Sequence, residues 1–436
     1  MKKALIITYY WPPSGGAGVQ RWLKFAKYLR EFGWEPVIYT PENPESPVID
    51  PSLEKDIPEG MTILKTKIVE PYTAYKRFVG RKKSDPIKAG FLSEKKNPSL
   101  TEKISVWIRG NFFIPDARMF WIRPSIRFLT NYLKTNPVDV IISTGPPHSM
   151  HMIALGVKKA TNLPWLADFR DPWTNIDFYD DLMLSGWADR KHKKQELEVL
   201  KNADEFVTVS WNWAKDFQKI YNRKIEVITN GFDPEDFPET WSNFDQKFSI
   251  VHIGAMNKDR NPHQLWVAIS ELLTELPVLR DRLEIKLIGS NDYSVLQSIS
   301  RHGLEPWLTT IKDIPHAEVV KHTVAAQVLL LALNDTPNVS GIIPGKIFEY
   351  IASRRPILCI GPEDGDSARI LNDTSAGQTV NFDDKVKIKR LLTTYFELYM
   401  KNDLKNLSSD FLRYSRKSLC GLMTGLLNNI AKTESK

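Results

Sequence analysis

Residues 340–357 read Ser-Gly-Ile-Ile-Pro-Gly-Lys-Ile-Phe-Glu-Tyr-Ile-Ala-Ser-Arg-Arg-Pro-Ile, and this stretch says more about the fold than any other part of the chain. The Pro-Gly pair opens a predicted helix with apolar residues at helical spacing, and the helix ends before Pro356. Residues 357–361 are apolar and predict a buried strand. A helix that leads directly into such a strand is typical of an α/β fold.

The start of this helix carries residues suited to a nucleotide. The unpaired N–H groups and partial positive charge of a helix N-terminus favour a phosphate, so Gly345 and Lys346 are candidate phosphate contacts. Glu349 follows about one turn later, where its carboxylate could accept hydrogen bonds from the two hydroxyls of a ribose. This pattern favours a nucleotide-sugar. The alternative is that Gly345 only makes the turn and that Lys346 and Glu349 are solvated.

Size and composition indicate a globular protein of two domains. With 436 residues the chain exceeds what one hydrophobic core usually organises, and its 42% hydrophobic and 25% charged residues are ordinary values. The two cysteines, Cys359 and Cys420, cannot form a disulfide framework. The first apolar run is too short for a secretory signal, and no run of 18 apolar residues occurs. We therefore expect a cytoplasmic protein.

Apolar strands alternate with helical stretches through both halves, which predicts a doubly wound α/β architecture. Predicted strands cover residues 4–9, 35–40, 138–144, 165–169 and 205–210 in the first half, and 248–254, 283–289, 327–332 and 357–361 in the second. The polar, aromatic segment 234–247 is the predicted linker.

These elements predict two Rossmann-like domains, residues 1–243 and 244–408, and a helical segment, 409–436, that is free to reach back to the first domain. Two such domains facing a central cleft would bind ligands at the carboxyl ends of their strands.

A glycine-rich loop, residues 12–21, follows the first predicted strand and opens a helix. Its Gly16-Ala17-Gly18 resembles the start of a dinucleotide fingerprint, but Arg21 stands where the third glycine is required. No acidic residue ends the second strand, so a nicotinamide cofactor is a poor fit and no cofactor is expected. The bare backbone of Gly15 and Gly16 still suits close approach to a phosphate or sugar.

Charged residues follow the strand at 165–169. Asp168, Arg170 and Asp171 are expected to face the ligand side of the sheet rather than its core, as candidate catalytic residues. His148 follows the preceding strand and is a candidate active-site imidazole. The alternatives are that Arg170 only orders the loop through ion pairs and that His148 only caps a helix.

Two bases follow the first strand of the second half. Lys258 and Arg260 lie in the loop after Gly254, where they could bind a pyrophosphate. The alternative is a pair of solvated loop charges.

No metal site is indicated by the sequence. The eight histidines are scattered, and neither an H-E-x-x-H motif nor a Cys/His cluster occurs. One Asp-Gly-Asp, residues 364–366, lies in a turn-forming run after a predicted strand, which favours a turn.

Basic residues concentrate in residues 65–127, where 15 Lys/Arg stand against 5 acids and aromatic residues are interleaved. Such a stretch could lie on an anionic membrane surface or engage an anionic acceptor. A solvated insertion is the alternative. No helix-turn-helix, zinc-ligand or ribonucleoprotein pattern accompanies it, so we expect no nucleic-acid partner.

Taken together, these motifs resemble the family-4 retaining glycosyltransferases of GT-B fold, of the bacterial surface-polysaccharide type. The resemblance spans nearly the whole chain: the first glycine-rich loop, the Asn-Gly-Phe-Asp at 230–233, the Gly254 loop and the Gly345-Lys346-x-x-Glu349 helix. It implies that Glu349 binds the donor ribose and that the Gly345 turn meets the donor phosphates. Arg260 matches the position of the family's phosphate-binding lysine.

The sequence departs from the family pattern at three positions. Eight residues before Glu349, where the family has a second glutamate that touches the donor sugar, stands Gly341. Ala255 replaces the usual arginine after the glycine of the second domain's first loop. Arg170 occupies roughly the place of a histidine found in many relatives, which puts the assignment of a base in doubt.

The resemblance implies metal-independent transfer of a sugar from a nucleotide-sugar to a glycan or lipid-linked acceptor, with retention of configuration. Asp171 or Asp168 would orient the acceptor, at the inner membrane face, in polysaccharide or glycolipid assembly. Two alternatives stay open: a nucleotide-sugar epimerase of the same architecture, and a non-catalytic relative that binds a nucleotide-sugar or glycan.

Overall fold

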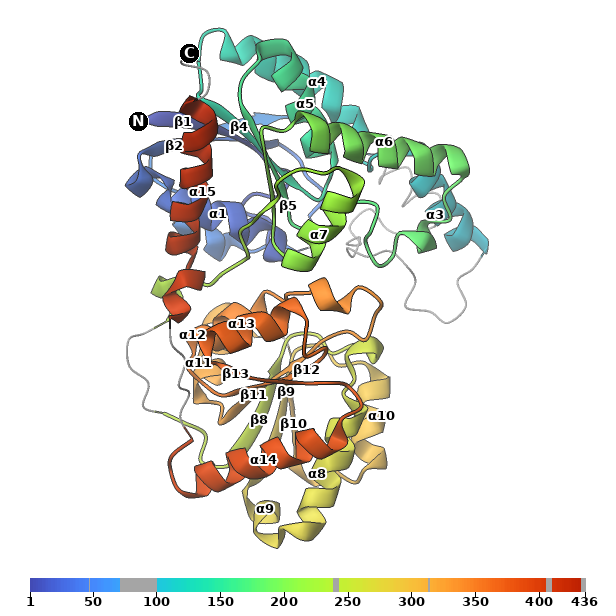
Figure 1. Ribbon diagram of the computed structural model, residues 1–436, viewed down its shortest axis with the longest axis vertical. Helices are drawn as coiled ribbons and strands as arrows, with labels where there is room; N and C mark the ends of the chain where they lie inside the picture. Colours follow the sequence, from blue (N-terminus) through green and yellow to red (C-terminus); the bar gives the residue numbers. More distant parts are fainter. Residues whose placement is uncertain (47, 71–99, 238–242, 313, 405–409, 433–436) are drawn as a thin grey trace. The chain divides into compact units, whose positions relative to one another are not determined.

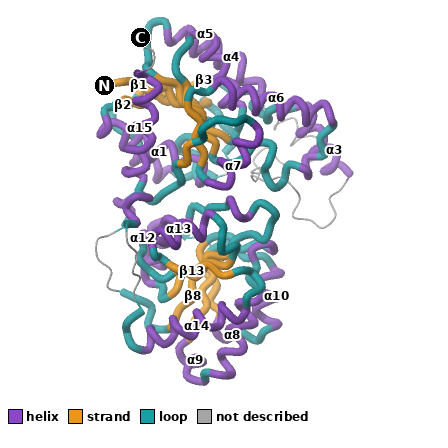
Figure 2. The backbone as a smooth tube through the Cα atoms, viewed as in Figure 1, coloured by secondary structure: helices purple, strands orange, loops and turns teal. Residues whose placement is uncertain are grey.

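The computed structural model describes residues 1–46, 48–70, 100–237, 243–312, 314–404 and 410–432. The chain forms two compact units, one of Met1–Thr229 with Arg416–Lys436 and one of Asn230–Ser415. Each unit holds its strands as an inner layer with helices outside it (Figure 2). The sequence predicted domain limits at 243/244 and 408/409. Those limits concern where each domain folds independently, and they stay a prediction.

The first unit is built on a parallel sheet of seven strands in the order β3-β2-β1-β4-β5-β6-β7 (Figure 1). Ile6 lies in register with Ile38 on one side and Ile142 on the other, so β1 is central and the order reverses beside it. The strands are β1 (Lys2–Ile7), β2 (Trp34–Pro41), β3 (Thr62–Thr66), β4 (Val140–Gly145), β5 (Trp165–Phe169), β6 (Glu205–Thr208) and β7 (Glu226–Val227).

Helices cover both faces of this sheet, and two separate apolar cores form between the layers. The helices are α1 (Ala17–Leu29), α3 (Leu100–Phe112), α4 (Met119–Leu133), α5 (Ser149–Thr161), α6 (Gly186–Asn202), α7 (Trp211–Ile220) and α15 (Arg416–Lys432). Serine side chains start two of them: Ser185 Oγ accepts from the Ala188 N–H of α6, and Ser210 Oγ accepts from the Trp213 N–H of α7.

The C-terminal helix α15 belongs to the first unit although it follows the second unit in the sequence. It lies beside α1 (Figure 1), and its Cys420, Met423 and Leu427 are buried in the same core as Trp22 and Phe25. The Cys420 thiol lies 3.7 Å from the carbonyl oxygen of Phe25. Burial of these apolar side chains fixes the helix to the unit.

The second unit has a parallel sheet of six strands in the order β10-β9-β8-β11-β12-β13. The strands are β8 (Phe248–Ile253), β9 (Leu283–Ile288), β10 (Leu308–Ile311), β11 (Val328–Ala332), β12 (Ile357–Ile360) and β13 (Gly377–Val380). The helices are α8 (His263–Glu275), α9 (Pro277–Arg282), α10 (Tyr293–Arg301), α11 (His316–Ala325), α12 (Lys346–Ala352), α13 (Asp366–Thr374) and α14 (Lys385–Met400).

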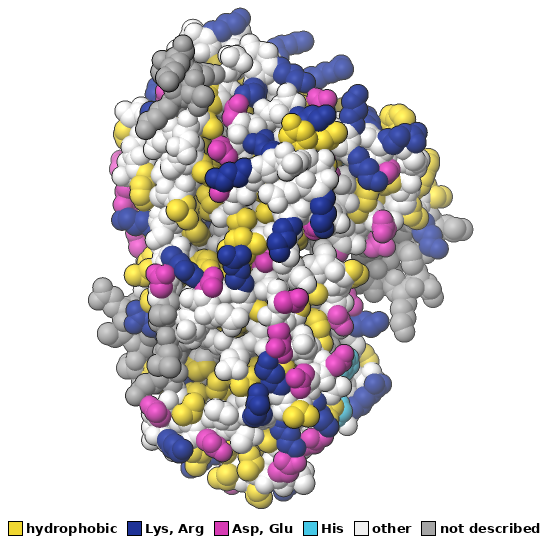
Figure 3. All heavy atoms as spheres, viewed as in Figure 1, with side chains coloured by type: hydrophobic (Ala, Val, Ile, Leu, Met, Phe, Trp, Pro, Cys, Tyr) yellow, Lys and Arg dark blue, Asp and Glu magenta, His cyan; other side chains and the backbone are white. Residues whose placement is uncertain are grey.

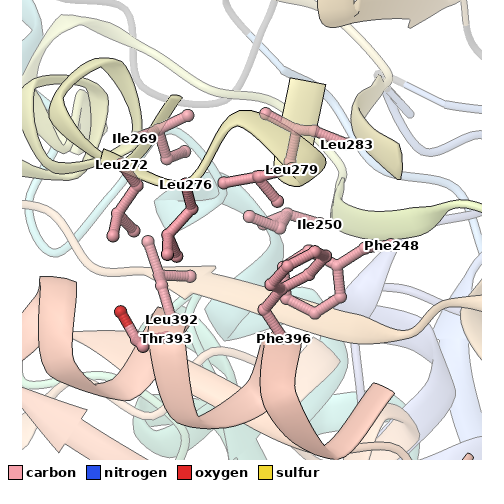
Figure 4. A pocket seen from close by; sticks show the side chains of 10 residues that line it. All are labelled: Phe248, Ile250, Ile269, Leu272, Leu276, Leu279, Leu283, Leu392, Thr393 and Phe396. Carbon is pink, nitrogen blue, oxygen red and sulfur yellow. The ribbon is translucent and has the colours of Figure 1, made fainter. Parts of the chain in front are cut away.

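One cavity inside the second unit is too small for a ligand. Between α8, α9, α14 and β8, ten side chains surround a cavity of about 10 Å³ (Figure 4). Apart from Thr393, the side chains that line it are apolar, among them Phe248, Ile250 and Phe396. A gap of this size is at the limit for one water molecule, so it is a packing defect rather than a binding site.

The predicted fold class is confirmed: both units are doubly wound α/β layers of parallel strands. Central strands agree with the prediction to within about two residues, as in β2 and β12. The helical segment predicted at 409–436 divides, within the described residues, into a 3₁₀ turn, Phe411–Tyr414, and α15. The predicted basic segment lies partly outside the described residues, at 71–99, and its described part includes α3 and α4.

Within the described ranges, no helix combines the length and apolarity needed to span a bilayer. The same residues contain no group of three or more His, Cys, Asp or Glu side chains placed to hold a metal ion. That the reaction proceeds without a metal stays a prediction.

Candidate active site

Two glycines shape the end of β8, where the polypeptide leaves the sheet of the second unit. Gly254 has φ +96° and Gly289, after β9, has φ +120°, both in the region that favours glycine. A Cβ on Gly289 would lie 2.9 Å from the Gly254 carbonyl, and a Cβ on Gly254 would lie 3.1 Å from Lys346 Nζ. Both glycines are therefore required if the loop is to leave room for that lysine.

Lys346 is the first residue of α12, and its side chain crosses to the end of β8. Its ammonium donates to the Ile253 carbonyl and lies 3.3 Å from His252 Nε2. Burial, together with the positive charge of Arg260, lowers the pKa of Lys346 to about 7. Lys346 is therefore divided between its charged and neutral forms near pH 7, and a nearby anion would favour the charged form.

His252 provides the second contact of the Lys346 ammonium. Its side chain is buried in β8, and Nδ1 lies 3.0 Å from the Leu330 carbonyl, which can only accept a hydrogen bond. Nδ1 therefore carries the proton, and the lone pair of Nε2 faces the Lys346 ammonium. Burial and the charge of Lys346 keep the pKa of His252 well below its usual range, so the ring stays neutral. The sequence reasoning did not identify this residue; the available signal was one polar side chain within the apolar run 250–253.

Arg260 provides a second cation at the same end of the sheet. It closes a short 3₁₀ turn, Lys258–Arg260, whose start is capped by Asn257 Oδ1 at 3.0 Å from the Arg260 N–H. One guanidinium nitrogen donates to the Ala255 carbonyl at 2.8 Å, whereas Nε is buried without a hydrogen-bond partner among the described residues. Burial lowers the pKa of Arg260. This N–H belongs to one cation, Arg260, and a second cation, Lys346, lies at the same end of the sheet. Together they favour an anionic ligand.

Tyr350 anchors α12 to β8. Its hydroxyl accepts a hydrogen bond from the Ile253 N–H at 3.0 Å, and its side chain is buried. Ser367 of α13 donates to the Ile342 carbonyl at 2.8 Å, which orders the segment before α12. These contacts fix the orientation in which α12 presents Lys346.

The remaining candidates of the second unit, Glu349, Gly345 and Lys258, differ in how exposed they are. Glu349 is half-buried on α12, and its charge acts on Lys346 one turn away by raising the lysine's pKa. Gly345 is exposed with φ −53° and ψ −33°, which any residue adopts, so the turn itself does not require glycine. A Cβ there would contact nothing within 4 Å. Lys258 is exposed, unlike Arg260 beside it.

In the first unit, Asp168 lies in the core, contrary to the expectation that it faces the ligand side. Its side chain is fully buried at the end of β5 and accepts from Arg21, Trp22 and Thr144 at 2.7–3.1 Å. Arg21, on α1, also donates to the Ile228 and Thr229 carbonyls. The oxygens of Asp168 are thus engaged inside the unit, and its role toward an acceptor stays a prediction.

Arg170 joins the first turn of α1 to the loop that follows β4. Its guanidinium donates to the Gly18 carbonyl at 2.9 Å and to the Pro146 carbonyl. A Cβ on Gly18 would lie 2.9 Å from this guanidinium, so a larger residue there would displace the Arg170 side chain. Burial lowers the pKa of Arg170. Arg170 thus holds these segments together through hydrogen bonds to carbonyls, and its role toward a ligand stays a prediction.

Asp171 and His148 lie close to this guanidinium. Burial raises the pKa of the half-buried Asp171 carboxyl, and the charge of Arg170 opposes this shift. The His148 ring stacks on Trp173 at 4.4 Å, and burial keeps its pKa well below the usual range. Its Nδ1 is buried without a hydrogen-bond partner among the described residues. A neutral imidazole with an unused nitrogen can meet a hydroxyl of a ligand.

The glycine-rich loop is held close to a neighbouring segment. The Gly15 N–H donates to the Val48 carbonyl at 2.9 Å, and a Cβ on Gly15 would lie 3.0 Å from the side chains of both Val48 and Asp50. Gly16 is exposed, has φ +90° and precedes α1. The conformation of Gly16 therefore favours glycine, and a larger residue at Gly15 would crowd Val48 and Asp50.

The structure thus brings the predicted residues together in two groups, one in each unit. Lys346, Arg260 and Glu349 form the group of the second unit, with His252 added. Arg170, Asp171 and His148 form the group of the first unit, at the carboxyl ends of β4 and β5. Each lies where parallel sheets bind ligands.

Residues 90–236 match the model of Glycosyltransferase Family 4. The matched segment covers about a third of the 436 residues and lies within the first unit except for its last residues. It contains Arg170, Asp171 and His148. No curated protein matches the sequence.

Solved structures of similar fold cover the chain from end to end. Anabaena Alr3699/HepE in complex with UDP and glucose has a TM-score of 0.62 at 12% identity, over 98% of this chain and 100% of its own. Sucrose-phosphate synthase from Thermosynechococcus elongatus has a TM-score of 0.58 at 12% identity, over 100% of both chains. The Candida albicans trehalose-6-phosphate phosphatase N-terminal domain has a TM-score of 0.65 at 14% identity, over 99% of this chain and 97% of its own. At these identities the likeness shows the fold, which is GT-B.

Proposed function

We propose that this protein is a glycosyltransferase that moves a sugar from a nucleotide-sugar donor to a glycan or lipid-linked acceptor, with retention of configuration and without a metal. The observation that carries the proposal is the pair of half-buried cations, Lys346 and Arg260, at the carboxyl end of the second sheet, with Glu349 one turn further along α12. The Glycosyltransferase Family 4 match supports it independently from the other unit.

The second unit would bind the donor. Two half-buried cations and a guanidinium N–H without a partner among the described residues stabilise a diphosphate better than fully solvated charges do, because less water screens them. Glu349 would accept hydrogen bonds from the ribose hydroxyls. Lys258, being exposed, would contribute at most through its long-range charge. The neighbour Alr3699/HepE was solved with UDP and glucose, which agrees with a nucleotide-sugar donor.

The first unit would bind the acceptor. Asp171 would orient the acceptor hydroxyl, and neutral His148 would add a hydrogen bond. The acceptor oxygen would form a bond to the anomeric carbon on the face from which the diphosphate leaves, as the bond from that carbon to the phosphate oxygen breaks. The acceptor proton would pass to the departing diphosphate, so no strong general base is required. Lys346 and Arg260 would neutralise the charge that grows on the leaving group.

We place the reaction in the cytoplasm, at the inner face of a membrane, in the assembly of a surface polysaccharide or glycolipid. The support is the sequence excess of ten positive charges over residues 65–127, interleaved with aromatic residues. An acceptor carried on a lipid would require such a location.

Gly341 is the specific observation that favours the second candidate, a non-catalytic relative that binds a nucleotide-sugar. Gly341 lies in a short 3₁₀ turn, Val339–Gly341, and provides no side chain to touch a donor sugar. A relative of this kind would bind the donor and release nothing.

Donor screening by thermal shift, followed by an assay of nucleoside diphosphate release, tests the proposal. A transferase releases diphosphate only when acceptor is added, whereas an epimerase converts the nucleotide-sugar alone and a binding protein does neither. Lys346→Ala should abolish release, and Lys321→Ala, which removes an exposed lysine of α11, should not. The anomeric configuration of the product, read by NMR, decides whether configuration is retained.

A further inference from the structure

A groove runs along the open edge of the second sheet, between α13 and α14. β13 is the last strand of this sheet, and in Figure 1 it lies between these two helices. Residues 376–379 form the floor of the groove, and side chains of α13 and α14 form its walls. Its volume is about 510 Å³, within the range of about 300–1,000 Å³ in which proteins bind small molecules. We call it the β13 groove.

Because the described sheet ends at β13, some backbone groups of this strand face the groove rather than another strand. The Ile357 N–H donates to the Ala376 carbonyl at 3.1 Å, so the backbone of Ala376 faces β12. Successive residues of a strand turn their N–H and C=O groups to opposite sides. The N–H and C=O groups of Gly377 and Thr379 therefore point away from β12 and are available along the floor of the groove.

The side chains around this floor add neutral groups that both donate and accept hydrogen bonds. Asn372 and Ser375 come from the C-terminal end of α13, Gln378 from β13 and Tyr395 from α14. Among the described residues, none of these four side chains has a hydrogen-bond partner. Amides and hydroxyls can each donate and accept, so the four side chains offer a ligand both kinds of hydrogen bond.

The β13 groove carries no net charge. The charged residues that line it, Lys387 and Glu363, pair with each other at 2.7 Å. Where β13 runs between α13 and α14 in Figure 1, Figure 3 shows mostly uncharged surface, with basic and acidic side chains next to one another at one side. A phosphate or a carboxylate would need an unpaired cation in such a site, so the groove favours an uncharged ligand.

We propose that the β13 groove binds an uncharged oligosaccharide. A sugar ring combines hydroxyls, which donate and accept hydrogen bonds, with C–H faces that pack on apolar side chains. The groove offers the same combination, because Leu371 of α13 and Leu398 of α14 line it and Tyr395 adds an aromatic ring. An extended peptide fits less well, since β13 has four residues and only two of them, Gly377 and Thr379, present backbone groups to the groove.

This site differs from both sites of the proposed function. The donor residues lie at the end of β8 and on α12, and two strands, β11 and β12, separate β8 from β13 in the sheet. The acceptor residues belong to the first unit. Saccharide binding to the groove does not rest on the proposed function, since it is measured without a donor. A failed transferase assay would leave it standing, and failed saccharide binding would leave the transferase proposal standing.

Titration calorimetry of the full chain with three uncharged tetrasaccharides, maltotetraose, cellotetraose and N-acetylchitotetraose, tests the proposal. At least one should bind, and hydrogen exchange should then show protection at residues 371–379. Asn372→Ala with Gln378→Ala removes two exposed amides of the groove and should weaken binding about tenfold. Asn243→Ala with Gln246→Ala, the matched control, removes two exposed amides elsewhere in the second unit and should leave binding unchanged.

Two further variants separate the groove from the acceptor site. Tyr395→Phe keeps the ring and removes the hydroxyl, so it should weaken saccharide binding without changing the unfolding temperature. Asp171→Ala, in the acceptor group of the first unit, should leave this binding in place. Failure of all three saccharides to bind would overturn the proposal, as would binding that Asp171→Ala abolishes and the groove variants preserve. Self-association that the groove variants abolish, without saccharide binding, would also overturn it, because a second copy would then cover the edge of β13.

Discussion

Arg21 and Asp168 form an ion pair at 2.8 Å in which both side chains are fully buried, although 147 residues separate them in the sequence. The pair joins α1 to the end of β5. Arg21 also donates to the carbonyls of Ile228 and Thr229, the last residues of the first unit before the chain crosses to the second. One buried guanidinium thus connects three distant segments of the first unit.

We expect Asp168→Ala to destabilise the first unit. The change leaves the Arg21 guanidinium buried without its counter-charge, which costs about 3–5 kcal/mol in comparable pairs. Denaturant unfolding followed by fluorescence measures the loss. Asp189→Ala, which breaks the exposed pair with Lys193, should cost less than about 1 kcal/mol. If Asp168→Ala instead keeps full stability and loses only activity, the residue acts on the acceptor.

Nucleoside diphosphate binding should depend on the protonation of Lys346. Because the pKa of Lys346 is about 7 in the folded protein, half of the molecules lack its charge near neutral pH. Anion binding then takes up a proton, so affinity should fall up to tenfold for each pH unit above 7. Calorimetry between pH 7 and 9 measures this. Lys346→Arg keeps its charge throughout and should give an affinity nearly independent of pH; an unchanged slope would show that another group titrates.

The same lysine predicts how stability changes with pH in the absence of ligand. Its ordinary pKa of 10.5 applies to the unfolded chain, so between pH 7 and 10.5 the unfolded chain holds a proton that the folded chain has lost. The free energy of unfolding should therefore rise with pH across this window, and the cost of burying the charge is fully present below pH 7. Lys346→Met should remove this contribution to the pH dependence.

Glu349 should be the main anchor of the nucleoside. Hydrogen bonds to a charged group contribute about 1.5–3 kcal/mol, so Glu349→Ala should weaken donor binding roughly ten- to hundredfold. Calorimetry with the nucleoside diphosphate measures the change, and Glu318→Ala, which removes a carboxylate of α11, is the matched control. Donor affinity that stays the same would remove Glu349 from the site.

Arg260 should act on the phosphates rather than on the nucleoside. Arg260→Ala should weaken nucleoside diphosphate binding much more than nucleoside binding, because only the diphosphate carries the charge that Arg260 meets. Arg260→Lys, which retains a cation, should restore part of the affinity. Equal weakening of both ligands would mean that the bond from Arg260 to the Ala255 carbonyl supports the loop and nothing more.

The periodicity of the sequence determined the central layers of the fold. Runs such as residues 4–7 and 357–360 are fully or almost fully buried on both faces of a parallel sheet, so they are continuous apolar segments that cannot be mistaken for amphipathic helices. The edge strands β3, β10 and β13 were not predicted. Thr62–Thr66, Leu308–Ile311 and Gly377–Val380 are short and only partly buried, so no continuous apolar run marks them.

The sequence by itself also placed Lys346 and Glu349 on one helix, because their separation of one turn is a local property. It placed Arg260 near them only through the rule that parallel strands present their carboxyl ends at one edge. The tertiary structure alone decided that His252 holds Lys346, that Asp168 turns inward to Arg21, and that Arg170 meets the first turn of α1. Each depends on contacts between segments far apart in the chain, and such pairings follow from how layers pack, which no local pattern of residues encodes.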